Sequence, residues 1–434
     1  MRLDFDIAGI SGQFSLQYHN VRLLTKLVKR IKPNCVIVLG GADATVRHRQ
    51  ILDEAPEIDA VIRGEGEFTF LEFVDNFYQK KILNHISGLS WRDGDKIVDN
   101  INPRPIVPID SIPLPAYEII DMDKYLEAMG RFPTRTYYGK RNGITIITSR
   151  GCPFQCVFCS VHLHMGRRWR GHSPEYVLHH IELLTRKYNI KYFHFEDDDL
   201  TSNPGRFEKI LDGIIEKRMD IWWDTPNGVR ADSFTQNLMD KCKISGCKFL
   251  IFGVESGSQR VLDTVINKKL LLKDVEKACN FAKRSGVNSR AFFIMGLPGE
   301  KKIDILKTAY FMIKLLLKYN TFSGAGPAIP LYGTELYKIS TKRGYLHDDV
   351  LKGDISLAYT KAGRLNTEDF DSGYPIRIIN ITERMLYYLE IIVFFKRILH
   401  APSLLGYIVT ELKKGFNRKN IKRIFNVIVF WIQD

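Results

Sequence analysis

Cysteine is scarce in this chain of 434 residues, and its scarcity excludes one class of protein. Seven cysteines are too few, and odd in number, for a small secreted fold held together by disulfides. Long apolar runs are also missing, because none reaches the roughly 18 residues that a membrane-spanning helix needs. The longest candidate, Met385 to Phe395, contains Glu390. No secretory signal is evident, so we expect a cytoplasmic protein, in which cysteines more often bind metals than form cross-links.

Acidic residues are outnumbered: 49 Asp and Glu face 63 Lys and Arg, for a net charge of +14 at pH 7. The excess is strongest from Pro375 to Asp434, where ten basic residues oppose four acidic ones. Such a balance can attract nucleic acid, anionic lipid or an acidic partner, although a solubilising surface explains it equally simply. The segment 381–434 is expected to be helical. It either caps the protein or makes a weak contact with an anionic membrane surface.

Strand patterns alternate with helical patterns along most of the chain, which predicts an α/β fold. Between residues 143 and 340 we expect five or six strand–helix units, too few for an eight-unit barrel, and therefore a partial (β/α)6 barrel of the TIM type. The expected strands are 144–148, 192–195, 221–224, 249–252, 290–295 and 325–329, and the expected helices are 174–188, 206–217, 235–244, 272–285 and 303–319.

Four parts are expected in order. Residues 1–95 read as a doubly wound α/β domain. Residues 96–142 form a strap, because five prolines fall between positions 103 and 115. Residues 143–340 hold the barrel, and residues 341–434 form a mainly helical, basic extension.

The clearest motif is a group of three cysteines, Cys152, Cys156 and Cys159, directly after the first expected barrel strand. A structural zinc site usually takes four ligands, and only His162 and His164 lie close enough in the sequence to complete one. A [4Fe–4S] cluster normally takes four cysteines, so three would leave one iron open to another ligand. The loop also lies where barrel enzymes place their chemistry, at the carboxyl ends of the strands.

With this spacing and position, the chain resembles the radical S-adenosylmethionine (SAM) enzymes. The resemblance implies a [4Fe–4S] cluster held by the three cysteines and SAM bound through its amino and carboxylate groups at the open iron. It also implies reductive cleavage of SAM to a 5′-deoxyadenosyl radical that takes hydrogen from a substrate. An outside electron donor, such as a flavodoxin or ferredoxin, would supply the electron.

Further segments match this family in order after each strand. The resemblance implies that acids at the end of the second strand hold the SAM ammonium group, that an arginine pairs with its carboxylate, that a glutamate accepts from the ribose hydroxyls, and that a glycine segment meets the adenine. The residues in these roles are Asp197 and Asp198, Arg230, Glu255 with Ser256, and Gly296. A closing Pro-x-x-Gly-Thr-x-Leu motif, beginning at Pro330, is typical of one large subgroup.

That subgroup carries a cobalamin-binding domain before the barrel, and residues 6–77 resemble its latter half. The resemblance places five residues along the edge of the corrin and its nucleotide tail: Ser11, Gly40, Gly41, Gly64 and Gly66. Asp43 stands where many relatives have a histidine. With half a domain and no histidine there, we expect the chain to bind cobalamin weakly or not at all.

The leading hypothesis is a radical SAM enzyme that methylates, cyclises or rearranges a small metabolite. A cobalamin-independent or degenerate relative is one alternative. A radical SAM enzyme that modifies tRNA is another, but Cys35 alone precedes Cys152, and no strand-rich RNA-binding module is evident at the C-terminus. A basic-aromatic run, Arg167 to Arg170, either touches an anionic ligand or lies on the surface.

Overall fold

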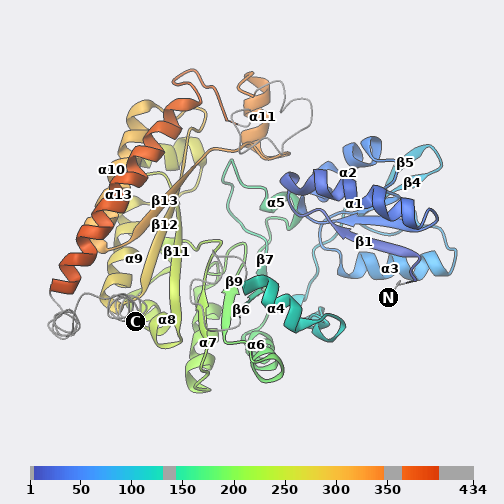
Figure 1. Ribbon diagram of the computed structural model, residues 1–434, viewed down its shortest axis with the longest axis horizontal. Helices are drawn as coiled ribbons and strands as arrows, with labels where there is room; N and C mark the ends of the chain where they lie inside the picture. The colour runs from blue at the N-terminus through green and yellow to red at the C-terminus, as the bar shows by residue number, and fades with distance from the viewer. Residues whose placement is uncertain (1–3, 131–142, 347–363, 400–434) are drawn as a thin grey trace, which may run out of the picture.

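The computed structural model describes residues 4–130, 143–346 and 364–399. Its two α/β bodies lie side by side (Figure 1), with the N-terminal domain at one end of the long axis and the barrel at the other. The strap between them carries three short elements: η2 (Ile109–Ser111), η3 (Tyr117–Ile119) and α4 (Met122–Gly130).

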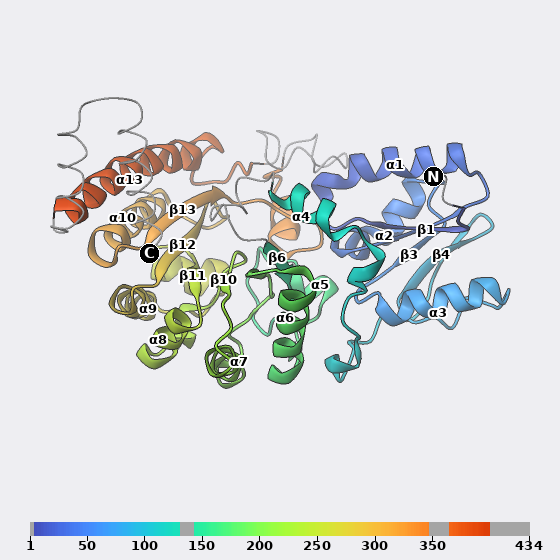
Figure 2. The same cartoon turned by 60° about the horizontal axis from the view of Figure 1, so that its bottom comes forward.

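The N-terminal domain is built on a five-stranded sheet in the order β1-β2-β3-β4-β5. The first three strands, β1 (Ile7–Ser11), β2 (Val36–Gly40) and β3 (Ala60–Ile62), are parallel. The turn η1 (Ser15–Gln17) leads into α1 (Tyr18–Ile31), and α2 (Ala42–Glu54) and α3 (Glu67–Tyr78) follow the next strands. Figure 2 shows α1 and α2 on one face of the sheet and α3 on the other.

Packing on both faces explains why β2 is a continuous apolar run. Ile37 and Leu39 pack with Val21 of α1, whereas Val38 points to the opposite face and packs with Phe73 of α3. The two cores together exclude water from β2 and fix its register against β1 and β3.

The sheet continues further along the chain than the sequence indicated. A hairpin of β4 (Leu89–Asp93) and β5 (Lys96–Asp99) adds two antiparallel strands, so the sheet reaches four residues past the expected boundary at residue 95. Asp93 pairs with Lys96, so the turn consists of Gly94 and Asp95, with Gly94 at φ of +59°. A two-residue Gly-Asp connection is favourable for a tight hairpin turn and could have revealed it.

Six parallel strands form the second sheet, in the order β13-β12-β11-β10-β9-β6. This is the expected partial barrel, open between its two edge strands. The strands are β6 (Gly143–Ile146), β9 (Tyr192–Phe195), β10 (Trp222–Asp224), β11 (Cys247–Glu255), β12 (Asn288–Met295) and β13 (Phe322–Pro327). The helices are α6 (Pro174–Tyr188), α7 (Pro204–Glu216), α8 (Gln236–Ile244), α9 (Leu272–Ser285) and α10 (Lys302–Tyr319).

Local capping defines the ends of these helices. Ser173, Asn203 and Thr235 each accept a hydrogen bond from a backbone N–H in the first turn of α6, α7 and α8. Proline follows directly at the first position of α6 and α7, where its missing N–H costs nothing. The large core beneath these helices includes Phe193, Trp223 and Phe252, all fully buried.

Smaller elements complete the mouth and the far edge of the barrel. At the mouth lie the antiparallel pair β7 (Ser149–Arg150) and β8 (Arg170–Gly171), α5 (Val161–His164), η4 (Ala231–Ser233), the π-helix η5 (Val261–Ile266) and α11 (Glu335–Lys342). The helix α13 (Gly373–Leu399) packs on α10 and β13. It therefore covers that edge of the barrel; residues 400–434 lie outside the described residues. In the described ranges, no helix is long and apolar enough to cross a bilayer.

Candidate active site

The three cysteines lie on a loop at the carboxyl end of β6, and several backbone contacts fix this loop. The N–H of Val157 donates to the carbonyl of Ile266 at 3.0 Å, and the N–H of Leu336 donates to the carbonyl of Val157 at 2.9 Å. Gly151 begins the loop with φ of +78°, and a Cβ there would lie 2.6 Å from the carbonyl oxygen of Arg168. Only glycine fits this turn without displacing the backbone.

These cysteines differ from the four others in their accessibility. Cys152, Cys156 and Cys159 are half-buried, whereas the remaining thiols, of Cys35, Cys242, Cys247 and Cys279, are buried. Burial raises the pKa of Cys152 to about 12 and that of Cys159 to about 11, so the free thiols are protonated at neutral pH. A metal must displace these protons to bind the sulfurs as thiolates.

The donor set fits an iron–sulfur cluster better than a single metal ion. Among the residues that the structure describes, no group of three or more His, Cys, Asp and Glu side chains could hold one metal ion. Zinc needs its ligands to converge on a point, whereas a [4Fe–4S] cluster takes each thiolate on a different iron. Three accessible thiols on one loop therefore suit a cluster with one iron left open.

The two acids expected at the SAM ammonium instead hold the cysteine loop. Asp197 is fully buried, and its Oδ1 accepts from the N–H of Thr148 at 3.1 Å and from the hydroxyl of Thr148 at 2.8 Å. The hydroxyl of Ser149 also donates to this oxygen. Asp198 Oδ2 accepts from the N–H of Gly151 at 2.8 Å. Both carboxylates thus fix the backbone that leads into Cys152.

Asp199, which the sequence did not single out, has a different environment. It is 4% exposed, and neither carboxylate oxygen makes a hydrogen bond of good geometry within the described residues. Burial raises the pKa of Asp199 to about 6, and the positive charges of Arg230 and Lys268, with the nearby Ser202 hydroxyl and Thr201 N–H, oppose this. An unpartnered buried carboxylate is costly unless a ligand satisfies it. Asp199 is therefore the acid at this strand end that is available to an ammonium group.

Arg230, expected at the SAM carboxylate, is already occupied in the structure. Its guanidinium donates to both carboxylate oxygens of Asp232, at 3.0 and 2.6 Å, and to the carbonyl of Lys268 at 3.1 Å. The same group stacks 3.7 Å from the ring centroid of Phe154 in the cysteine loop. Arg230 thus connects the third strand end to the cysteine loop.

Lys268 is a second cation beside the cysteine loop. It is buried, and its Nζ donates to Glu255 Oε1 at 2.9 Å. Burial disfavours the charged form of Lys268, but the nearby Glu255 and Cys156 favour that form more strongly, so the pKa of Lys268 is raised. Glu255 itself adopts φ of +73° where the register of β11 against β12 shifts. Such a conformation is uncommon for a residue other than glycine and clusters at functional sites.

Ser256 and Gly296 directly follow β11 and β12, and both are buried. Ser256 is fully buried and its hydroxyl shares a hydrogen bond of 3.2 Å with the hydroxyl of Thr308 in α10. The N–H groups of Gly296 and Leu297 both donate to Glu300 Oε2, at 2.7 and 3.1 Å. Glu300 thereby closes the turn after β12, in the segment expected to meet adenine.

This closing carboxyl gives stability a predictable pH dependence. Burial raises the pKa of Glu300 from 4.5 to about 7, so the folded state keeps its proton longer than the unfolded state does. The stability gained is complete below pH 4.5 and is lost as pH rises through about 7, a change of about 2–3 kcal/mol. Glu300→Gln should flatten this dependence when urea unfolding of the apoprotein is followed across that range. An equally steep dependence in the variant would assign it to other groups.

The five residues expected along the corrin come together in the structure. Ser11, Gly40, Gly41, Gly64 and Gly66 line one cavity of about 510 Å³ at the carboxyl ends of β1, β2 and β3. The barrel forms the facing wall with Ile147, Arg150 and Met165. No histidine of the described residues lines this cavity, and Asp43 is paired with Arg47 at 2.7 Å. A ligand here would meet backbone, apolar side chains and the charged groups of Glu65, Glu67 and Arg150.

Buried ion pairs join this cavity to the cysteine loop. Glu65 binds Arg150 at 3.0 Å through Oε2 and Arg170 through Oε1, and Arg150 also binds Glu67. Arg150 directly precedes Gly151, so the glycine loop after β3 is tied to the start of the cysteine loop. The basic-aromatic run is thereby explained: Arg170 serves this contact, and Trp169 donates to the carbonyl of Asp199 at 2.8 Å.

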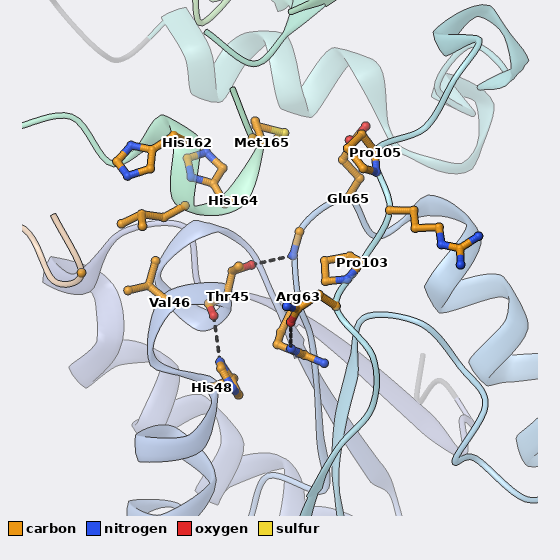
Figure 3. A pocket seen from close by; sticks show the side chains of 16 residues that line it. Thr45, Val46, His48, Arg63, Glu65, Pro103, Pro105, His162, His164 and Met165 are labelled. Carbon is orange, nitrogen blue, oxygen red and sulfur yellow. Dashed lines mark hydrogen bonds between the residues drawn. The ribbon is translucent and has the colours of Figure 1, made fainter. Parts of the chain in front are cut away.

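A second cavity, of about 460 Å³, adjoins the first one and shares Gly64, Glu65 and Met165 with it. Figure 3 shows His162 and His164 of the α5 region on one side, and α2 with Thr45 and Val46 on the other. The hydroxyl of Thr45 accepts from the N–H of Gly64 at 2.9 Å. The two histidines that the zinc alternative required thus line the space between the domains.

Comparisons with known proteins agree with this architecture. The radical SAM superfamily model matches residues 146–312, and the B12 binding domain model matches residues 1–74. An uncharacterized methyltransferase of Pyrococcus horikoshii is 36% identical over 349 residues, which cover 80% of this chain and 71% of the relative. The cytidylyl-2-hydroxyethylphosphonate methyltransferase of Streptomyces wedmorensis is 30% identical over 369 residues, which cover 79% of this chain and 67% of the relative.

The fold recurs in the solved structure of the cobalamin-dependent SAM radical enzyme OxsB with aqua-cobalamin and SAM bound. The TM-score is 0.69 at 19% identity, and the superposition covers 97% of this chain and 62% of OxsB. At that identity the likeness concerns the fold alone. The sequence matches carry the assignment: this chain is a member of the radical SAM superfamily, in the group whose radical domain follows a B12-binding domain.

Proposed function

We propose that Cys152, Cys156 and Cys159 hold a [4Fe–4S] cluster and that the chain, a radical SAM enzyme, transfers a methyl group to a small molecule. One observation carries the proposal: three accessible thiols at the barrel mouth lie beside an unpartnered buried acid, Asp199, and a buried pair, Lys268 and Glu255. When bound, the cluster supplies the electron that opens SAM into methionine and a 5′-deoxyadenosyl radical.

Different residues around the cysteine loop would bind the different polar groups of SAM. Asp199 offers two oxygens to the ammonium group. Lys268 offers its charge to the carboxylate, and Glu255 Oε2 remains open to a ribose hydroxyl while Oε1 holds Lys268. Charge-assisted bonds of this kind are stronger than neutral ones, and burial strengthens them further. Arg230 positions Phe154 and the lysine carbonyl without contacting SAM itself.

The glycine-lined cavity supports a second cofactor. We assign it to cobalamin because one wall carries Ser11 and four glycines, which allow a bulky ring to approach the backbone closely. Among the described residues no imidazole lines this cavity to bind the cobalt, so we expect the affinity to be weak. Methyl transfer suits this arrangement, since the relatives from Pyrococcus and Streptomyces are both methyltransferases.

Gly40 allows this cavity to be blocked without disturbing the fold. A Cβ at Gly40 would have no heavy atom within 4 Å, so Gly40→Val extends into the cavity and not into the protein. We expect titration with hydroxocobalamin, followed by the visible spectrum, to show binding in the wild type and at least a roughly tenfold loss in the variant. Equal binding by both proteins would place cobalamin elsewhere.

The function itself is tested by product analysis under anaerobic conditions. The reconstituted protein with a chemical reductant should convert SAM to 5′-deoxyadenosine. In the cell we propose a flavodoxin or ferredoxin as the donor. SAM labelled in its methyl group should pass the label to a small molecule from an extract in the presence of cobalamin. If SAM is cleaved but no label is transferred, the proposal of radical chemistry stands and the proposal of methyl transfer is wrong.

A further inference from the structure

The helix α13 has two apolar faces, and only one of them is covered. Pro375, Ile379, Thr382 and Leu386 follow one another at helical spacing and are buried against the barrel edge. This face packs on α10 and β13 and accounts for the position of the helix in Figure 1.

A second stripe runs along α13 with the same spacing but lies in solvent. It consists of Ile381, Met385, Tyr388 and Ile392, which are between 47% and 65% exposed. Tyr387 lies beside it, with its ring 5.6 Å from that of Tyr388, and is 61% exposed. Contiguous exposed apolar residues usually mark a contact with a partner or a membrane, because burying them is favourable.

The charges around the stripe indicate the kind of partner. On α13 itself, Arg377 and Arg384 are balanced by Glu383 and Glu390. From Lys396 to the last residue, however, the sequence contains eight lysines and arginines but only Glu411 and Asp434 as acids. Tyrosines are also enriched where a protein meets the headgroup region of a bilayer. An exposed apolar stripe that continues into a strongly basic segment suits an anionic lipid surface.

We propose that α13 docks the enzyme on an anionic lipid bilayer, with the stripe Ile381, Met385, Tyr388 and Ile392 entering the interface. The helix runs along the barrel edge far from the N-terminal domain, as Figures 1 and 2 both show. Docking there leaves the cavities between the two domains open to their ligands. The proposal is independent of the cluster and of SAM.

The helix α1 provides a matched comparison within the same chain. It also exposes an apolar stripe, formed by Leu23, Leu24, Leu27 and Ile31. Two of its four basic residues form ion pairs, Arg22 with Glu57 and Lys29 with Asp59. No basic segment follows α1, because residues 33–59 contain two arginines and five acids. The comparison therefore separates exposed apolar area alone from exposed apolar area that continues into a strongly basic segment.

The test is flotation of the full chain with vesicles of phosphatidylcholine, with and without phosphatidylglycerol. We expect flotation only with the anionic lipid, weakening as salt is added. The double variant Met385→Glu/Tyr388→Glu should lower the bound fraction at least roughly tenfold, whereas Leu23→Glu/Leu27→Glu should leave it unchanged. Both pairs are exposed, so melting curves should match the wild type.

Several outcomes would overturn the proposal. No flotation at low salt would exclude lipid docking. Equal flotation of the α13 variant and the wild type would move the contact away from the stripe. Equal losses in the α1 and α13 variants would show that charge does not select the surface. A wild-type dimer that the α13 variant makes monomeric would assign the stripe to a second copy of the chain.

Discussion

Replacing any one of Cys152, Cys156 and Cys159 with alanine is expected to abolish 5′-deoxyadenosine formation, a loss of several orders of magnitude. Each sulfur would hold a different iron, so no neighbouring group can substitute for a missing one. The turn at Gly151 and the hydrogen bonds that join Val157 to Ile266 and Leu336 fix the loop, so it cannot bring a fourth thiol into place. Anaerobic reconstitution, followed by iron analysis and chromatography of the SAM products, measures both effects.

Cys35→Ala is the control for this prediction. Cys35 is a buried thiol next to β2 in the N-terminal domain and lies outside the cysteine loop. Its removal leaves a small cavity of modest cost, so cluster content and SAM cleavage should persist. A triple alanine variant that still holds a full cluster and cleaves SAM would refute the assignment of all three cysteines.

The second large effect is expected at Lys268. Lys268→Met leaves Glu255 buried without its partner, which should cost about 3–5 kcal/mol of folding stability. It also removes the cation proposed for the SAM carboxylate, which should lower SAM affinity by about 1–3 kcal/mol, or roughly 5- to 150-fold. Urea unfolding and equilibrium dialysis with labelled SAM measure the two losses separately.

A double variant distinguishes binding from structural support. Glu255→Gln/Lys268→Met removes both charges, so much of the lost stability should return. SAM affinity should stay low, because the carboxylate still lacks its cation. Recovery of affinity together with stability would mean that Lys268 only maintains the fold. Arg230→Lys should weaken SAM binding less than Lys268→Met does, since Arg230 is already paired with Asp232.

The barrel could be predicted closely from the sequence because its signals are local. Strand β9 and helices α6 and α9 have the expected bounds, since apolar periodicity and capping residues such as Ser173 define them. The antiparallel hairpin after β3 was missed because its strands are short and half polar. Its two-residue turn, Gly94-Asp95, was the signal that could have revealed it.

The cysteine loop and the glycine cavity were also predictable, since each motif follows a strand end and strand ends share one edge of a sheet. The division of roles among polar residues was not. Three consecutive aspartates look alike in the sequence, and only the fold shows that Asp197 and Asp198 bind backbone whereas neither carboxylate oxygen of Asp199 has a partner among the described residues. Lys268 reaches Glu255 across thirteen residues through η5, a contact with no local signature.

The central claim is that three cysteines hold a cluster whose fourth iron is open to SAM. Low-temperature electron paramagnetic resonance of the reduced, reconstituted protein tests it most directly, with spectra recorded before and after SAM is added. The account predicts about four irons per chain and a cluster signal whose g-values shift on SAM binding, because a new ligand reaches one iron. A cluster signal that SAM leaves unchanged, in a protein shown by dialysis to bind SAM, would contradict it.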